Sequence, residues 1–290
     1  MRDPSNQTLS FYATPHGRTD PADLASCLQD LPTSVESLSK VLQNVLVHVL
    51  EAWRYGLELD PERKSEVQIG NARGMLKRIV ELDPRPLARS RLPECRVVAT
   101  CHDYAVLLCA MLRHQGRPAR ARAGFASYLN PARNVDHWLC EYWSPSSHRW
   151  VRVDAQLDGL QRSAYGISFD PCDVPATAYL SGAEAWHSCR TGRLEPASCG
   201  FSRWGGWGYV RHVLLRDLLA LDKQEGLPWE PIGIPYLDDA EVAEDDRTEL
   251  DAIARTAMGP ESQPIHTLCE RVLRWGRPPD WSPWTLDDVP

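Results

Sequence analysis

The stretch TCHDYAVLLCAMLRH, residues 100–114, decides the fold of this chain because it predicts one buried helix with a cysteine at its start. After Cys101, apolar residues fill most positions up to Leu112, without glycine or proline. The sequence QGRP at residues 115–118 then supplies a helix stop and a turn. A thiol acts as a nucleophile only as the thiolate, and the positive end of a helix favours that form. Cys101 is therefore the first candidate for chemistry.

Three segments after this helix predict strands, at residues 119–128, 136–143 and 149–157. A helix followed by neighbouring antiparallel strands is typical of an α+β fold and not of an alternating, doubly wound sheet. We therefore predict that the Cys101 helix packs on an antiparallel sheet, with a helical region before this core and an extension after it.

A nucleophilic cysteine needs a base, and the base needs a group that orients it. Ser144–His148 reads as a hairpin connection by composition. If its turn is centred near Pro145 and Ser146, His137 lies directly opposite Asp154 on one face of the two strands, within side-chain reach. A slip of one residue in this register would place His137 and Asp154 on different faces.

These residues resemble the core of bacterial transglutaminase-like proteins. In that superfamily Cys-x-Asp-x-Ala is followed by Gly-x-Pro-Ala-Arg, by a histidine that precedes a strand, and by Trp-x-x-x-Asp. The matching positions here are Cys101-His102-Asp103-Tyr104-Ala105, Gly116-Arg117-Pro118-Ala119-Arg120, His137-Trp138 and Trp150-Val151-Arg152-Val153-Asp154. The family's tryptophan two residues after the histidine is here one residue after it, and Thr100 replaces a common glycine or asparagine. The flanks, including CGFSRWGGWG at residues 199–208, resemble those of one subgroup of bacterial transglutaminase-like proteins. This second resemblance does not indicate a particular reaction.

The resemblance implies a papain-like α+β core with a Cys-His-Asp triad. Cys101 would be the nucleophile, His137 the general base and acid, and Asp154 the residue that orients His137. The implied reaction is acyl transfer from an amide through an acyl-enzyme, with water as acceptor in an amidase or peptidase and an amine in a transamidase. Two alternatives stay open: an acyltransferase that uses a carrier-protein or coenzyme A thioester and a small amine in natural-product biosynthesis, and a binding module without catalysis.

The composition limits the classes of partner that we expect for this protein. A formal net charge of −7 argues against nucleic acid or an anionic membrane surface as the main partner, and no apolar segment is long enough to span a bilayer. Nine irregularly spaced cysteines without a CxxC pair predict reduced thiols, not a disulfide framework or a zinc site. We see no signal peptide and expect a cytoplasmic protein that needs no cofactor and no metal. The expected partner is an amide- or thioester-containing substrate. An acyl carrier protein would be favoured by clustering beside Cys101 of four arginines: Arg117, Arg120, Arg122 and Arg133.

The chain divides into three expected parts: an N-terminal arm with helices at residues 1–92, the core with its extension at 93–235, and an acidic segment with a tail rich in Trp and Pro at 236–290. Before the core we expect a short strand or docked arm at Leu9–Ala13, a helix from N-cap Thr33 to about Tyr55, and one or two helices after Asp60. After the core we expect a helix within 181–193, a loop at Cys199–Gly208 and a helix at Tyr209–Lys223. The chain should then continue with a solvated or flexible acidic stretch at Asp238–Asp251 and an extended tail from Trp275.

The remaining reactive side chains are predicted to be structural. Core positions are expected for three cysteines, Cys109, Cys140 and Cys269. His102 and His114 are expected on the helix surface, and Asp103 is expected to support the N-terminus of the helix. Trp204 and Trp207 could line a substrate pocket, or could fill a core as tryptophans commonly do.

Overall fold

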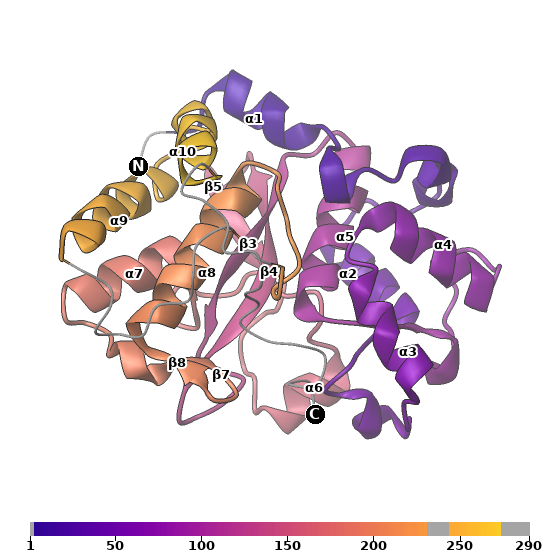
Figure 1. Ribbon diagram of the computed structural model, residues 1–290. Helices are drawn as coiled ribbons and strands as arrows, with labels where there is room; N and C mark the ends of the chain where they lie inside the picture. Colours follow the sequence, from indigo (N-terminus) through magenta and orange to yellow (C-terminus); the bar gives the residue numbers. More distant parts are fainter. Residues whose placement is uncertain (1–2, 231, 233–243, 274–290) are drawn as a thin grey trace. The chain divides into compact units, whose positions relative to one another are not determined.

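The computed structural model describes residues 3–230, 232 and 244–273 (Figure 1). The chain forms two compact units, which are taken one at a time below. Unit 1 contains Met1–Thr8, Arg122–His137 and Pro175–Val289, and unit 2 contains Leu9–Ala121 and Trp138–Val174. The predicted division after residues 92 and 235 stays a prediction.

The described strands form two sheets. One is a two-stranded parallel sheet of β1 (Leu46–His48) and β2 (Val97–Ala99). The other has six strands in the order β6-β3-β4-β7-β8, with β5 paired to β4. Their bounds are β3 Ala119–Ala126, β4 Asn134–Ser144, β5 Arg149–Val153, β6 Tyr179–Ser181, β7 Cys199–Phe201 and β8 Trp204–Gly205. Most pairs in the larger sheet with a defined register are antiparallel, and together with the helices they confirm the α+β class.

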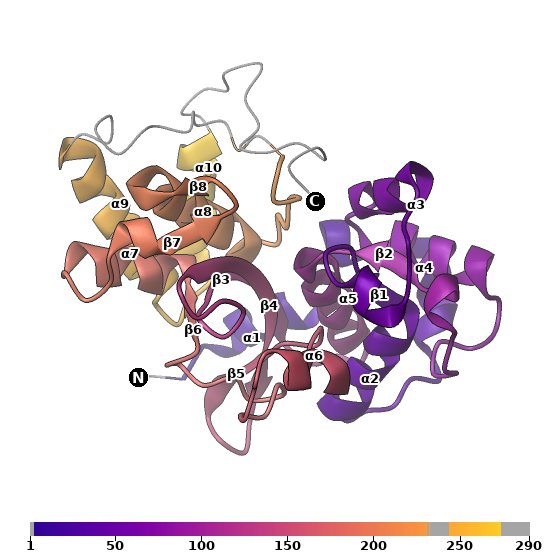
Figure 2. The same cartoon turned by 90° about the horizontal axis from the view of Figure 1, so that it is seen from below.

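Unit 2 has α5 (Cys101–His114) among its helices, and α5 starts and ends where the sequence predicts (Figure 1). The helices α2 (Val35–Val45) and α4 (Ala72–Leu82) contact α5. Figure 2 shows β1 and β2 beside α4 and α5. The shorter helices of this unit include α3 (Pro61–Ser65), α6 (Gly159–Ala164) and several 3-10 helices, among them the one at Ala52–Tyr55. Because its neighbours cover it on several sides, α5 is buried along nearly its whole length.

The segment predicted as one helix from Thr33 to Tyr55 forms several elements, so that prediction is wrong at both ends. The N-cap is Ser34, whose hydroxyl accepts from the N–H of Ser37 at 3.1 Å. The helix ends at Val45, and the next three residues form β1. Pairing with β2 overrides the helical spacing here because the branched side chains of this stretch suit a strand. After Asp60, which caps α3 as predicted, two separate helices form.

The α5 helix packs on β4 within unit 2. The Sγ atoms of Cys109 and Cys140 are 3.3 Å apart, and the rings of His102 and Trp138 meet edge to face with centroids 4.9 Å apart. These contacts confirm that the cysteine helix packs on antiparallel strands. They also show that the surface position predicted for His102 is wrong, because its side chain is fully buried against the sheet.

The hairpin of β4 and β5 has a different register from the expected one. The last pair of this ladder is Cys140 with Val153, so one further pair would set Leu139, and not His137, opposite Asp154. The turn is centred one residue later than expected, and His148 at its end has a left-handed φ of 48°. Composition marked the loop correctly but could not locate its centre.

The corrected register keeps the alternation of faces, because every partner moves by two residues. Glu141 and Arg152 share a face and are joined by an ion pair of 3.2 Å. The opposite face carries Trp138, Cys140 and Val153, which are buried.

Unit 1 is built around α8 (Gly206–Leu221), a helix buried along nearly its whole length. The helices α7 (Gly182–Arg190), α9 (Glu244–Ala257) and α10 (Gln263–Leu273) contact α8 (Figure 1). Gly182 permits the close approach of α7, since a Cβ there would lie 2.5 Å from the carbonyl oxygen of Val213. This packing confirms the helices predicted within 181–193 and at Tyr209–Lys223.

Three other expectations for the flanks need correction. Leu9–Ala13 belongs to the helix α1 (Asn6–Ala13) and is not a strand. Cys199–Gly208 is not a loop, because it forms β7, β8 and the first residues of α8. Part of the acidic stretch is helical in α9, where the Asp251 carboxylate accepts from Arg190 at 3.0 Å and from the Trp186 indole at 2.8 Å. The rest of that stretch and the predicted tail lie outside the described residues.

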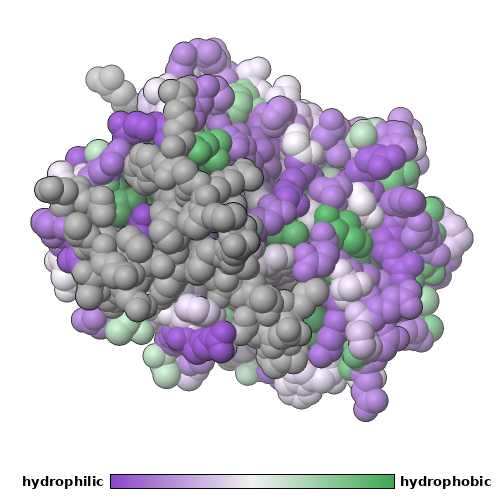
Figure 3. All heavy atoms as spheres, in the orientation of Figure 1, coloured by the Kyte–Doolittle hydropathy of each residue, from purple (hydrophilic) through white to green (hydrophobic). Residues whose placement is uncertain are grey.

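The described surface is largely hydrophilic on the face shown in Figure 3, with small hydrophobic areas between the polar ones. The exposed large apolar side chains are Trp53, Leu92, Leu160 and Leu273. None of the helices in the described part of the chain is both long and apolar enough to cross a membrane.

Candidate active site

Cys101 is the first residue of α5 and is partly exposed, whereas His102–Arg113 are buried. The chain enters the helix through Thr100, whose N–H and hydroxyl both donate to Oδ2 of Asp103, at 2.8 and 3.0 Å. This arrangement confirms that Asp103 supports the helix N-terminus. It holds the backbone at Cys101, so the thiol has a defined position at the positive end of the helix.

Asp154 lies in the same unit as Cys101, directly after β5, and is only 2% exposed. Its backbone N–H donates to the carbonyl of Pro171 at 2.8 Å, and its Oδ1 accepts from the N–H of Gln156 at 3.2 Å. The chain just past β5 is thus held by its own backbone. The carboxylate of Asp154 is buried and oriented, as a residue that positions a base requires.

Tyr104 is a buried residue in the first turn of α5. Residues three apart lie on one face of a helix, so Tyr104 shares its face with Cys101. Burial raises the pKa of the Tyr104 hydroxyl, and the negative charges of Asp158 and Asp154 act in the same direction. Tyr104 is therefore within electrostatic range of both carboxylates.

His137 is 2% exposed and belongs to unit 1. Its ring meets that of Tyr128 edge to face, with centroids 6.0 Å apart. Its carbonyl accepts from the hydroxyl of Tyr179 at 3.3 Å, and the same hydroxyl donates to the carbonyl of Arg122 at 3.1 Å. Cys101 and Asp154 share a unit and His137 lies in the other, so the meeting of all three side chains stays a prediction.

Asp136, which the sequence did not single out, precedes His137 on β4. Its Oδ2 accepts from the Tyr209 hydroxyl at 2.7 Å, while its Oδ1 is buried without a hydrogen-bond partner among the described residues. Burial raises the pKa of this carboxyl to about 6, although the Tyr209 hydrogen bond and the charges of His137 and Arg216 lower it. A carboxyl group whose pKa is raised toward neutral pH therefore precedes the predicted base on β4.

The buried face of the hairpin in unit 2 is charged. Glu141 is 2% exposed, accepts from Arg120 at 2.8 Å and accepts from Arg152 at 3.2 Å. The Arg120 guanidinium also lies 4.1 Å from the centre of the Trp150 ring. These contacts tie three strands of the sheet together through one carboxylate.

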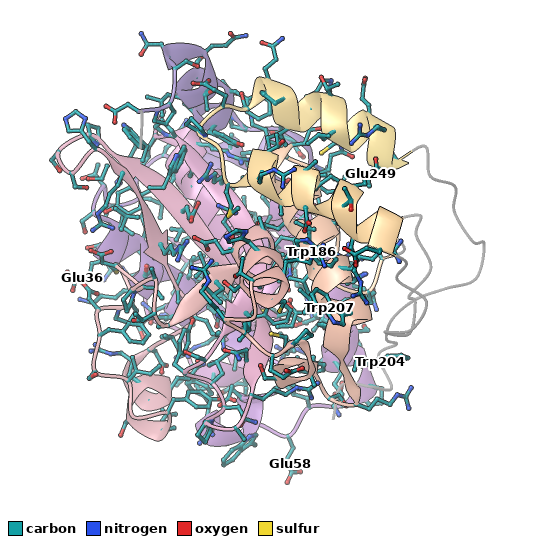
Figure 4. The ribbon with its side chains drawn as sticks, turned by 90° about the vertical axis from the view of Figure 1, so that its left-hand side faces the viewer. Glu36, Glu58, Trp186, Trp204, Trp207 and Glu249 are labelled. Atoms are coloured by element: carbon teal, nitrogen blue, oxygen red, sulfur yellow. The ribbon has the colours of Figure 1, made fainter. Side chains whose placement is uncertain are left out.

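The remaining predictions concern cysteines and tryptophans. All three cysteines expected in the core, Cys109, Cys140 and Cys269, are fully buried. Trp207 packs against Trp186 with ring centroids 5.3 Å apart, and Figure 4 shows these two rings together with Trp204 close by. The guanidinium of Arg247 covers Trp207 at 4.8 Å. Trp207 therefore has a packing role within unit 1.

All nine cysteines are free thiols. Among the described residues no group of three or more His, Cys, Asp and Glu side chains is arranged to hold a metal ion.

An α-helix that begins at a cysteine and packs on antiparallel strands is the core arrangement of the class of papain-like α+β proteins. Residues 83–155 match the family model described as the transglutaminase-like superfamily core, and this segment contains Cys101, His137 and Asp154. This segment of the chain is similar to the transglutaminase-like core.

One solved structure is also similar, that of a protein from Cytophaga hutchinsonii described as a candidate cysteine protease. The two chains are 16% identical, with a TM-score of 0.33, over 59% of this chain and 44% of the other. The similarity therefore spans less than half of that protein. No curated protein matches the sequence.

Proposed function

We propose that this protein is a cysteine enzyme that transfers an acyl group from an amide. Cys101 is the nucleophile, His137 the general base and acid, and Asp154 the residue that orients His137. The observation that supports this most is the position of Cys101, partly exposed at the positive end of a helix whose following residues are buried. A chain that used this fold only for binding would have no need of that position.

The reaction has two stages. The Cys101 thiolate attacks the carbonyl carbon, a C–S bond forms, the C–N bond breaks and His137 gives its proton to the leaving amine. Water or another amine then attacks the thioester, its proton passes to His137 and the C–S bond breaks. Water as acceptor makes the protein an amidase or peptidase, and an amine makes it a transamidase.

Backbone N–H groups would stabilise the negative charge that develops on the carbonyl oxygen. Upstream of Cys101, the N–H of Val98 already donates to Glu66 at 2.7 Å and that of Thr100 to Asp103 at 2.8 Å. The first N–H groups of an α-helix have no acceptor within the helix. We therefore assign this role to the N–H of Cys101 and rule out the two engaged upstream groups as its partner.

The contacts of four arginines favour an amide over a carrier-protein thioester as the acyl donor. These arginines are the cations that could have recognised an acidic carrier protein. Arg120 is paired with Glu141 at 2.8 Å and Arg122 with Asp217 at 2.7 Å. Arg133 donates to the carbonyls of Ser202 and Trp204, and Arg117 to that of Thr33. Since all four cations bind groups of this chain, they do not support a docking surface for an acidic carrier.

Mass spectrometry of the intact protein tests the proposal. We expect an acyl adduct on Cys101 after mixing with p-nitrophenyl acetate, and with amide substrates when turnover is stopped by acid. The internal controls are the other partly exposed thiols, Cys27, Cys95 and Cys172. An adduct spread evenly over the four thiols, or faster labelling of a control thiol by iodoacetamide, would leave the binding module as the better reading.

Substitution of Asp154 by asparagine should lower kcat/KM for acyl transfer by about a hundredfold to ten-thousandfold, because asparagine cannot stabilise the imidazolium form of His137. Because Asp154 is buried, a water molecule cannot take the place of its carboxylate in the variant. The matched control is Asp173→Asn, an exposed aspartate of the same unit paired with Arg149. Equal rates for Asp154→Asn and the control variant would remove Asp154 from the mechanism.

A further inference from the structure

The ring of Tyr128 packs against the imidazole of His137 within unit 1. The two rings meet edge to face, with an interplanar angle of 84° and centroids 6.0 Å apart. His137 is only 2% exposed, whereas Tyr128 is partly exposed. The tyrosine ring thus offers a surface to solvent directly beside the proposed base.

Tyr128 lies on the loop of residues 127–133, which joins β3 to β4 and is fixed at both ends. At its start, the N–H and the hydroxyl of Ser127 both donate to the carbonyl of Ala178, at 3.0 and 3.2 Å. These two bonds tie the residue before the tyrosine to the chain that leads into β6. The backbone at Tyr128 therefore continues from a fixed point.

The end of this loop is held by Arg133, whose guanidinium donates to the carbonyls of Ser202 and Trp204. Two glycines of the neighbouring β7–β8 hairpin leave room for this guanidinium. A Cβ at Gly200 would lie 2.2 Å from Nη2 of Arg133, and a Cβ at Gly205 would lie 2.6 Å from it. Because both ends of the loop are anchored, the tyrosine is held beside the base before a substrate binds, as a residue that determines specificity requires.

The distances place the Tyr128 ring within reach of a substituent on the reacting nitrogen. Proton transfer brings the nitrogen of the leaving or entering amine to about 3 Å from an imidazole nitrogen of His137. In benzylamine the phenyl ring is attached one carbon away from that nitrogen. Aromatic rings attract one another with centroids roughly 4.5–7 Å apart, and the Tyr128 ring lies 6.0 Å from the imidazole. A substituent of this size can therefore contact Tyr128 while its nitrogen is at the base.

We propose that Tyr128 selects the amine that leaves or enters the acyl group on Cys101, by contact with an aromatic substituent close to the amine nitrogen. The inference rests on the proposed function, in which His137 exchanges a proton with that nitrogen. Leaving and entering amines occupy the same place, because one stage is the chemical reverse of the other. The substrate class is therefore an amide whose leaving amine carries an aromatic group near its nitrogen.

Competition between two amines for one acyl-enzyme tests this role. Acetyl-Cys101, formed from p-nitrophenyl acetate, is offered equal concentrations of benzylamine and ethylamine, and the amides formed without protein are subtracted. With either amine a C–N bond forms, the C–S bond breaks and His137 takes the proton of the attacking nitrogen. We expect Tyr128→Ala to lower the ratio of N-benzylacetamide to N-ethylacetamide by about twofold to tenfold, the range of one aromatic contact. A general disturbance of the site lowers both products and leaves their ratio unchanged.

Further variants separate the ring from the rest of the side chain. Tyr128→Phe keeps the ring and should keep the wild-type ratio, whereas Tyr128→Leu, a second variant without a ring, should lower it. The matched control is Tyr142→Ala, near the other end of β4, where a partly exposed ring lies 5.1 Å from the Arg117 guanidinium. Its ratio should equal that of the wild type.

Three results overturn the inference and leave the proposed function standing. They are an unchanged ratio in Tyr128→Ala, an equal fall in Tyr142→Ala, and no benzylamide from a wild-type protein that does form acetyl-Cys101. Absence of acetyl-Cys101 overturns both the inference and the proposed function.

Discussion

Substitution of Cys101 by alanine should lower acyl transfer at least about a thousandfold, because no other atom can form the covalent intermediate. Alanine suits the first turn of a helix and removes only a partly exposed thiol, so the fold should be kept. The capping bonds between Thr100 and Asp103 do not involve the side chain of Cys101. The effect should therefore appear in kcat, with the unfolding temperature close to that of the wild type.

The measurement is the rate of p-nitrophenol release together with intact mass, for the variant and for a control. Cys95→Ala is the control of choice, since Cys95 is another partly exposed free thiol of unit 2. A Cys101→Ala protein that turns over at the wild-type rate would refute the proposed nucleophile. Cys101→Ser adds a second check, because a hydroxyl at the same place is a far weaker nucleophile than a thiolate.

Of the substitutions considered, removal of the Glu141 carboxylate should cause the largest loss in the free energy of unfolding. In Glu141→Ala the guanidinium groups of Arg120 and Arg152 lose their shared carboxylate in a buried position. Breaking a buried ion pair by removing one partner costs about 3–5 kcal/mol in the free energy of unfolding. Urea denaturation, followed by tryptophan fluorescence, measures this directly because Trp150 stacks on Arg120.

An exposed ion pair of the same unit is the control for this prediction. Glu36 accepts from Lys40 at 2.6 Å, and both side chains are more than half exposed. Glu36→Ala should leave the free energy of unfolding close to that of the wild type, because exposed ion pairs contribute little to stability. A loss in Glu141→Ala no larger than in this control would show that the buried network contributes little to stability.

Local patterns predicted the parts of this protein whose structure depends on neighbours in the sequence. The run from Cys101 to His114 forms one helix, because its apolar residues continue without a breaker until Gly116, where φ is +71°. Asp60 and Asp103 act at helix starts as their positions suggested. The hairpin after Ser144 was also expected, and only its centre was misplaced.

The same patterns failed where a distant segment decided the outcome. Leu46–His48 continues a helical pattern but forms a strand, because Val97–Ala99 pairs with it. His102 resembles a surface residue of the helix but is buried against Trp138. Gln156 belongs to no motif, and only the tertiary structure shows its buried hydrogen bond to Gln161.

The sequence by itself determined a helix that starts with Cys101, the antiparallel strands that follow and the candidate set of Cys101, His137 and Asp154, because spacing and order along the chain carry that information. Only the tertiary structure decided the register of the hairpin, which depends on how the loop closes. It also decided which arginines are already paired, because those pairs are contacts between residues far apart in the sequence.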